Sequence, residues 1–167
     1  MPHGGAEKGL GPRLRRARRD DIGVLAAVTG GPEAGRIRCL RRILGSLASD
    51  VYLALDGAGP RGVVMVAYHR SIARGGLVGT VDVLASLDPP GAVLSREVGG
   101  LLLDCVLERA RRRGCVSIEA ACGDESLSAL FASAGFEGFA ARLSLPLRIG
   151  DATQVGGSGR RPEPGES

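Results

Sequence analysis

Two spacings of hydrophobic residues alternate along the chain, and they predict the order of its helices and strands. Strands are expected where apolar residues alternate or run together, at residues 13–18, 50–56, 61–71, 76–86, 115–122 and 139–147. Helices are expected where apolar residues recur every three or four positions, at residues 21–30, 31–50, 94–114 and 124–135. Asp20 is the expected cap of the first helix, and the third starts near Arg96 or Glu97.

The order of these elements, β-α-α-β-β-β-α-β-α-β, predicts the fold class. Three consecutive strands, two of them joined by the hairpin turn "IARGG", favour an antiparallel meander. The later strand–helix–strand passage favours a parallel crossover. Together they predict an α+β fold with a mixed central sheet of about six strands and about four helices packed on its faces.

Composition sets the boundaries of the domain. One domain is expected over residues 12–149, because segments 1–11 and 150–167 are rich in Gly, Pro and Ser and have little to bury. No apolar run reaches the roughly 18 residues of a membrane span, and no secretory signal is recognisable, so we expect a cytoplasmic protein. The cysteines show neither a C-x-x-C pair nor zinc spacing, and buried free thiols are expected at Cys39, Cys105, Cys115 and Cys122.

The charge balance gives little support to a nucleic-acid partner. The net charge is +4, and Lys8 is the only lysine among 22 basic residues. Arginines within residues 13–19 could contact phosphates, whereas the run at 109–113 is expected to form a solvated helix face. Aromatic residues, on which single-stranded nucleic acids stack, make up only 3% of the chain.

The stretch "LSREVGGLLLDCVLERARRRG", Leu94 to Gly114, places Gly99 and Gly100 in the first turns of the strongest predicted helix. A glycine inside a helix costs roughly 1 kcal/mol against alanine, so the pair needs a reason. Glycines at a helix start let a phosphate approach the free N–H groups there. They equally allow close packing of helix on sheet, and the local sequence does not decide between the two.

From Val98 onward this stretch resembles the third helix of the GNAT family of N-acyltransferases, and "LFASAGF", which ends at Phe136, resembles the end of that family's fourth helix. The similarity in element order covers roughly residues 13–147. It implies acetyl-CoA as co-substrate, with its pyrophosphate held by backbone N–H groups of Val98 to Leu101. The residues that the resemblance assigns to the cofactor are Val83, Leu84, Ala85, Leu94, Ser95, Arg96, Glu97, Val98, Gly99, Gly100, Leu101 and Phe131.

The family's motif, [RQ]-x-x-G-x-[GA], is only partly kept, and two registers are open. Counting back from "ARRRGC" puts Leu94 on the Arg/Gln position, Glu97 on the first Gly and Gly99 on the Gly/Ala position. Leu94 has no donor for phosphate, and the Glu97 carboxylate repels a diphosphate unless it points away or pairs with an arginine. A shift by two residues puts Arg96 on the Arg/Gln position and Gly99 on the first Gly. The loop "LDPPGAV" is also longer than the family's usual link.

The chemistry that the resemblance implies, acetyl transfer to an amine, needs a base and an acid. Asp82, in "TVDVL" beside the expected cofactor, is the candidate catalytic base, and a solvated strand residue is its alternative reading. Glu119 is a second candidate, more typical of a structural residue. At the position of the tyrosine that often acts as the general acid in the family, this chain has Phe131. His69 and Tyr68 could line an acceptor groove, although a histidine at a strand end is more often a surface residue.

These expectations combine into an acyl-CoA-dependent N-acetyltransferase that moves an acetyl group from acetyl-CoA to an amine of a small molecule or a protein. The alternative is a catalytically weak or inactive protein of the same fold that uses the CoA site for binding or regulation. A basic nucleic-acid-associated module is a third reading. No metal and no membrane partner is expected, and a homodimer is compatible with the resemblance.

Overall fold

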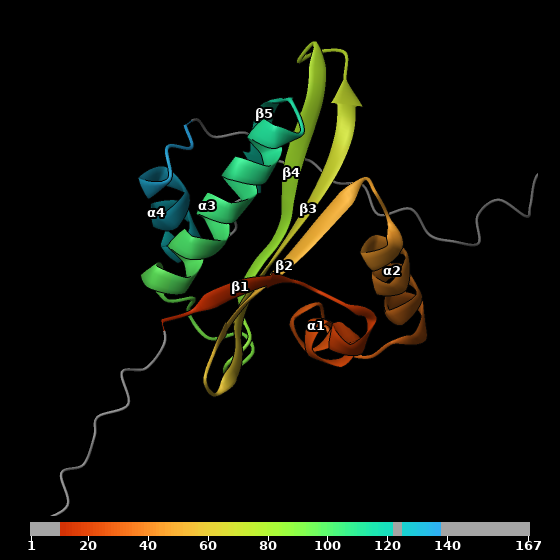
Figure 1. The fold of residues 1–167 in the computed structure, drawn as a ribbon, viewed down its shortest axis with the longest axis vertical. Helices are drawn as coiled ribbons and strands as arrows, with labels where there is room; N and C mark the ends of the chain where they lie inside the picture. The colour runs from red at the N-terminus through yellow and green to blue at the C-terminus, as the bar shows by residue number, and fades with distance from the viewer. Residues whose placement is uncertain (1–10, 122–124, 138–167) are drawn as a thin grey trace, which may run out of the picture.

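The computed structural model describes residues 11–121 and 125–137, which form one mixed sheet with helices on both faces (Figure 1). The strands are β1 (Arg13–Arg16), β2 (Ser49–Asp56), β3 (Gly59–Ser71), β4 (Gly76–Ser86) and β5 (Cys115–Ala120). The helices are α1 (Ile22–Val28), α2 (Ala34–Gly45), α3 (Arg96–Arg112) and α4 (Glu125–Ser133), with a 3-10 turn, η1 (Arg19–Asp21), before α1.

The strands lie in the order β1-β2-β3-β4-β5, which confirms the predicted meander and crossover. β1 to β4 pair antiparallel with their neighbours, and β5 pairs parallel with β4 after the chain has crossed over through α3. The α+β class is therefore confirmed, with five strands among the described residues. The strand predicted at 139–147 lies outside those residues, as do segment 150–167 and, apart from Gly11, segment 1–11.

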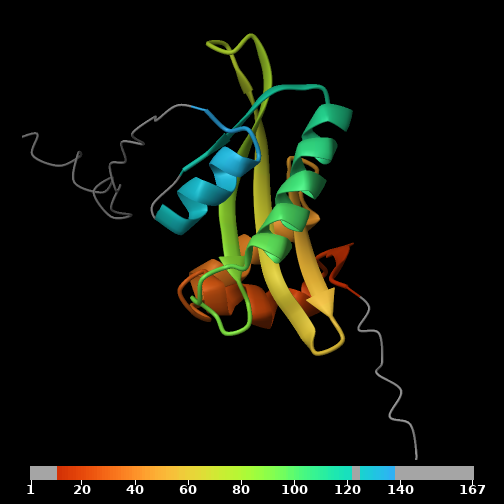
Figure 2. The same ribbon diagram turned by 90° about the vertical axis from the view of Figure 1, so that its left-hand side faces the viewer.

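Each face of the sheet carries its own hydrophobic core, because side chains alternate across the strands. α3 and α4 lie in front of the sheet in Figure 2, and α1 and α2 lie behind it. The core under α3 includes Val64, Val66, Leu102, Leu103 and Val106. The core under α1 and α2 includes Leu25, Leu40, Val51, Leu53 and Val63.

Asp21, rather than the predicted Asp20, organises the start of α1. The Asp21 carboxylate accepts hydrogen bonds from Arg15 Nη1 and Nη2, both at 2.7 Å, and from the Arg18 backbone N–H at 2.6 Å. These hydrogen bonds, above all those from the Arg15 guanidinium, hold the pKa of Asp21 below its usual range. Asp20 is exposed, and the N-cap position of α1 is Asp21, so the capping prediction is wrong by one residue.

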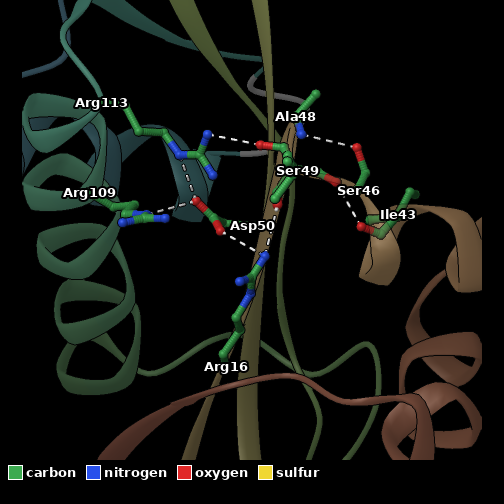
Figure 3. Close-up of polar contacts among 9 residues, drawn as sticks. Arg16, Ile43, Ser46, Ala48, Ser49, Asp50, Arg109 and Arg113 are labelled. Carbon is green, nitrogen blue, oxygen red and sulfur yellow. Dashed lines mark hydrogen bonds and ion pairs between the residues drawn. The ribbon is translucent and has the colours of Figure 1, made fainter.

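A buried carboxylate, Asp50 at the start of β2, joins three elements of the fold (Figure 3). Its side chain is 0% exposed, and its Oδ2 accepts from Arg109 Nε at 3.0 Å and Arg113 Nε at 3.1 Å, both near the end of α3. Arg16 Nη2, at the end of β1, lies 3.2 Å from Oδ1. Next to it, Ser49 Oγ donates to the Ile43 carbonyl in the last turn of α2.

The arginines around Asp50 are placed by further contacts. Arg113 Nη1 donates to the Leu47 carbonyl at 2.9 Å, and its guanidinium lies 4.2 Å from the centroid of the Tyr68 ring. A carboxylate buried in this way is tolerated only when it is paired and hydrogen-bonded. The arginine run of α3 was expected as a solvated face, and this is wrong for Arg109 and Arg113, which turn toward Asp50, whereas Arg111 and Arg112 are exposed.

Replacing Asp50 should therefore destabilise the whole domain. We expect Asp50→Asn to lower the free energy of unfolding by about 2–4 kcal/mol, since three arginines lose their carboxylate but keep part of their contact with water. Asp104→Asn is the matched control, because Asp104 is an exposed carboxylate of α3. Urea unfolding at neutral pH measures both, and equal stabilities for the two variants would contradict the role given to Asp50.

Candidate active site

β4 and β5 separate halfway along β4, and this separation opens one edge of β4. The last pair in the β4–β5 ladder is Val81–Ala120, whereas β4 continues to Ser86. Backbone groups of Val83 to Ser86 that face the β5 side therefore have no ladder partner among the described residues of β5. An unpaired strand edge can hydrogen-bond an extended ligand in the way that it would bond another strand.

A β-bulge places Asp82 at this point of separation. Val66 pairs with Val81 and Met65 with Val83, so Asp82 is the extra residue of β4 between these two pairs. A bulge of this kind redirects a side chain and increases the local twist. Asp82 is exposed, as the solvated reading of the sequence expected.

An open cavity of about 210 Å³ adjoins the unpaired edge of β4. Its lining comes from the end of β4, the following loop and the first turn of α4, namely Leu84, Ala85, Ser86, Gly91, Ala92, Val93, Leu94, Ser126 and Leu127. Leu84, Ala85 and Leu94 were candidates from the sequence. The others were missed, because only the unusual length of the loop signalled that it would form a wall.

Two neighbouring residues of β3 anchor the loop that forms this wall. At its beginning, the Arg61 guanidinium pairs with Asp88, and the Arg61 carbonyl accepts from the Leu87 N–H at 2.9 Å. At its end, Leu94 fits over Gly62, where an added Cβ would lie 3.1 Å from Leu94 Cδ1 and 2.7 Å from Val98 Cγ1. Both ends of the loop, and the start of α3, are thus held against the same strand.

Hydrogen bonds within the start of α3 already satisfy some of its backbone N–H groups. Ser95 is the N-cap, and its side chain accepts from the Val98 N–H at 3.3 Å. The Gly99 N–H donates to the Ser95 carbonyl at 2.8 Å. The N–H groups of Val98 to Leu101 were expected to be free. This is wrong for Val98, whose N–H is bonded by the Ser95 side chain, and for Gly99, whose N–H makes the first i→i−4 bond of the helix. Ser95, Arg96 and Glu97 are exposed.

The two glycines of α3 differ in their surroundings. A Cβ at Gly99 would lie 2.4 Å from Leu130 Cδ2 of α4 and 3.1 Å from Leu94 Cδ2, so this glycine lets α4 approach α3 closely. A Cβ at Gly100 would meet nothing within 4 Å. The packing explanation thus accounts for Gly99, and it does not account for Gly100.

Three comparisons relate the chain to known proteins. No family model and no curated protein matches the sequence. Among solved structures, a transcriptional regulator from Bacillus halodurans C-125 matches with a TM-score of 0.68 at 18% identity, over 81% of this chain and 99% of that one. An aminoglycoside 6'-N-acetyltransferase from Acinetobacter baumannii has a TM-score of 0.66 at 13% identity, over 84% of this chain and 100% of its own.

A glucosamine-6-phosphate N-acetyltransferase from Arabidopsis thaliana is similar in the same way, with a TM-score of 0.66 at 10% identity, over 83% of this chain and 100% of that chain. The chain has the GNAT fold. At these identities the likeness shows the fold, and the roles of individual residues have to be argued from the site itself.

Within the GNAT fold, the remaining candidates divide between core and surface. Phe131 is buried in the core under α3, and its ring packs edge-on against Phe136 with centroids 5.0 Å apart. Tyr68 is also buried, which raises its pKa, and it packs under Arg113 instead of lining a groove. Glu119 pairs with Arg74 at 2.9 Å, as a structural residue would, and His69 is exposed.

Other kinds of site find no support in the part of the chain that the structure describes. No group of three or more potential metal-ligating side chains lies together among residues 11–121 and 125–137. Cys39, Cys105 and Cys115 are free thiols, as predicted, but Cys39 is exposed and the other two are only partly buried. Cys122 lies outside the described residues. None of the described helices has the length and apolar character that crossing a membrane requires.

The contrast between the glycines of α3 predicts opposite effects of the same substitution. Gly99→Ala should lower the free energy of unfolding by about 1–2 kcal/mol, because overpacking against buried Leu130 outweighs the gain in helix propensity. Gly100→Ala should raise it by up to about 1 kcal/mol, because the new methyl group meets no neighbour. Thermal and urea unfolding of both variants check this, and stabilisation by Gly99→Ala would contradict the packing role.

Proposed function

We propose that the chain is an acyl-CoA-dependent N-acetyltransferase, which moves an acetyl group from acetyl-CoA to an amine of a small molecule or a protein. The observation that carries this proposal is the separation of β4 from β5 at the Asp82 bulge, next to an open cavity, in a GNAT fold. The solved acetyltransferases of this fold act on amines of an aminoglycoside and of a sugar phosphate, by their names. An amine acceptor is therefore the class that we propose here.

The residues present fit the thioester arm of such a donor. The edge of β4 over Val83, Leu84 and Ala85, which has no ladder partner in the described part of β5, supplies backbone donors and acceptors for an extended arm that contains amides. The aliphatic side chains of Leu84, Leu94 and Leu127 line the cavity beside that edge and suit the arm's methylene groups. When bound, the donor supplies an acetyl group on sulfur, which is activated toward attack by an amine.

In the proposed reaction Asp82 acts as the general base. The amine nitrogen forms a bond to the acetyl carbon as the carbon–sulfur bond breaks. One proton of the amine passes to the Asp82 carboxylate, directly or through one water, and the sulfur leaves as a thiolate that takes a proton from solvent. The position of Asp82, exposed at the point where the two strands separate, supports this role.

Asp82→Asn should lower the turnover of acetyl-CoA with a panel of amines by roughly 10²- to 10⁴-fold while leaving acetyl-CoA affinity unchanged, because it removes the proton acceptor and keeps the size of the side chain. Glu108→Gln, an exposed carboxylate on the outer side of α3, is the control that should match wild type. If Glu119→Gln loses turnover and Asp82→Asn does not, Glu119 is the general base instead. Absence of both transfer and binding in wild type would refute the proposed function.

A second candidate is a catalytically weak GNAT-fold protein that uses the same site for binding or regulation. It is favoured by Phe131, which has no hydroxyl to give a proton to the leaving sulfur and which packs in the core. The similar Bacillus halodurans protein carries the name of a transcriptional regulator. Binding of acetyl-CoA without transfer to any amine would select this candidate.

Wild-type turnover on generic amines should be slow. Phe131→Tyr should raise it only where the added hydroxyl reaches the sulfur from the core, and a general acid positioned in that way contributes roughly 10²- to 10⁴-fold. Steady-state rates with the amine panel measure this, and unfolding experiments on the same variant show whether the buried hydroxyl is tolerated. A fast wild type that Phe131→Tyr leaves unchanged or slows would mean that the thiolate receives its proton by another route. Cytoplasmic location and a homodimer stay predictions.

A further inference from the structure

The first turn of α3 lies beside the cavity. It contains hydrogen-bond acceptors of its own and one carboxylate. Ser95 Oγ already accepts from the Val98 N–H, and the Ser95 carbonyl accepts from the Gly99 N–H. Glu97 adds an exposed carboxylate in the same turn, where the helix dipole favours it. The Val98 N–H is one of the helix-start N–H groups that would otherwise be available to an anion, whereas the Gly99 N–H makes the ordinary i→i−4 bond of the helix.

The charge next to this turn is balanced. Arg96 and Glu97 are adjacent and both exposed, so their side chains together bring no net positive charge to the start of α3. Leu94 packs against Gly62 and Gly99 at the edge of the cavity, and its aliphatic side chain offers no donor. The cavity wall that follows β4 consists of aliphatic residues, glycine and two serines among the described residues.

We propose that the donor site recognises the S-acyl pantetheine arm and gains little affinity from the diphosphate and nucleotide, so that Glu97 and Ser95 are donor-specificity residues. This inference rests on the proposed function and names its donor class more closely. S-acetylpantetheine, which lacks phosphate, should then serve as a donor as well as acetyl-CoA does. The bond changes are the same with either donor, giving an N-acetyl amine and a free thiol.

The experiment compares three ligands that differ only beyond the arm: pantetheine, 4'-phosphopantetheine and CoA. Titration calorimetry with the full chain should give dissociation constants within about fivefold of one another, since exposed charge contacts contribute at most about that factor. Initial rates with the three acetyl thioesters and one amine should show the same small spread in kcat/KM. A preference of wild type for CoA over pantetheine of more than about thirtyfold, the mark of charge-assisted phosphate contacts, would overturn the inference.

Variants of the helix start test which residues are responsible. Glu97→Gln should improve CoA affinity by about two- to fivefold at low salt and leave pantetheine affinity unchanged, with the gain lost in roughly 1 M salt. Ser95→Gly, which frees the Val98 N–H while keeping a tolerated cap, should shift the ligand ratio in the same direction. The ratio of the two affinities is insensitive to a general loss of stability, and Glu108→Gln should leave it at the wild-type value.

The outcomes separate the two proposals. Two results would show that the protein contacts the diphosphate: binding of all three ligands with a strong preference for CoA, or a selective loss of CoA affinity in Arg96→Gln. Either result would overturn the inferred preference for the pantetheine arm and would leave the proposed donor site intact. Failure of all three ligands to bind would overturn the proposed function and this inference together. Similar affinities for the three ligands, with a shift toward CoA in Glu97→Gln, would establish the inference.

Discussion

The fold depends on one buried carboxylate. Asp50 has no exposed side-chain surface, so its charge is balanced by arginines from the end of β1 and the end of α3. Because Arg109 and Arg113 lie one turn apart on α3, their joint contact with Asp50 fixes both the position of the helix end and its rotation about its own axis. The helix cannot slide or roll on the sheet without leaving that carboxylate unpaired, which is costly in a buried site.

The opposite end of α3 is fixed by close packing instead of charge. Gly62 and Gly99 admit Leu94, Val98 and Leu130 at distances that a Cβ would prevent, so the start of the helix lies directly on β3 and against α4. A helix held in this way at both ends behaves as a rigid spacer between the end of β4 and the start of β5. The edge that β4 exposes beyond Val81, the bulge at Asp82 and the cavity wall are all positioned relative to this spacer.

The elements of this architecture could be predicted from the sequence because each is encoded locally, by periodic apolar residues and by turns such as "IARGG". The predicted bounds of β3 and β4 agree with the structure almost residue by residue. What could not be predicted depends on distant partners. Asp50 meets arginines 59 and 63 residues further on, and nothing near "SDVYLAL" indicates them. Gly99 and Gly100 are identical as letters, and only the approach of Leu130 distinguishes their roles. The same holds for Phe131, whose place in the core depends on Phe136 and on α3.

The start of α3 shows how the needs of the fold and of a ligand compete for the same backbone groups. The N–H groups of a first helical turn can be satisfied by a cap or by a bound anion, but not by both at once. Ser95 commits the Val98 N–H to the fold, and Glu97 places a carboxylate where the helix dipole would otherwise attract a phosphate. Stability of α3 in the free protein is thereby independent of any ligand. In the proposed donor site, recognition would then rest on the part of β4 that has no ladder partner in β5 and on the aliphatic cavity, whose contacts suit a neutral, extended arm better than a charged end.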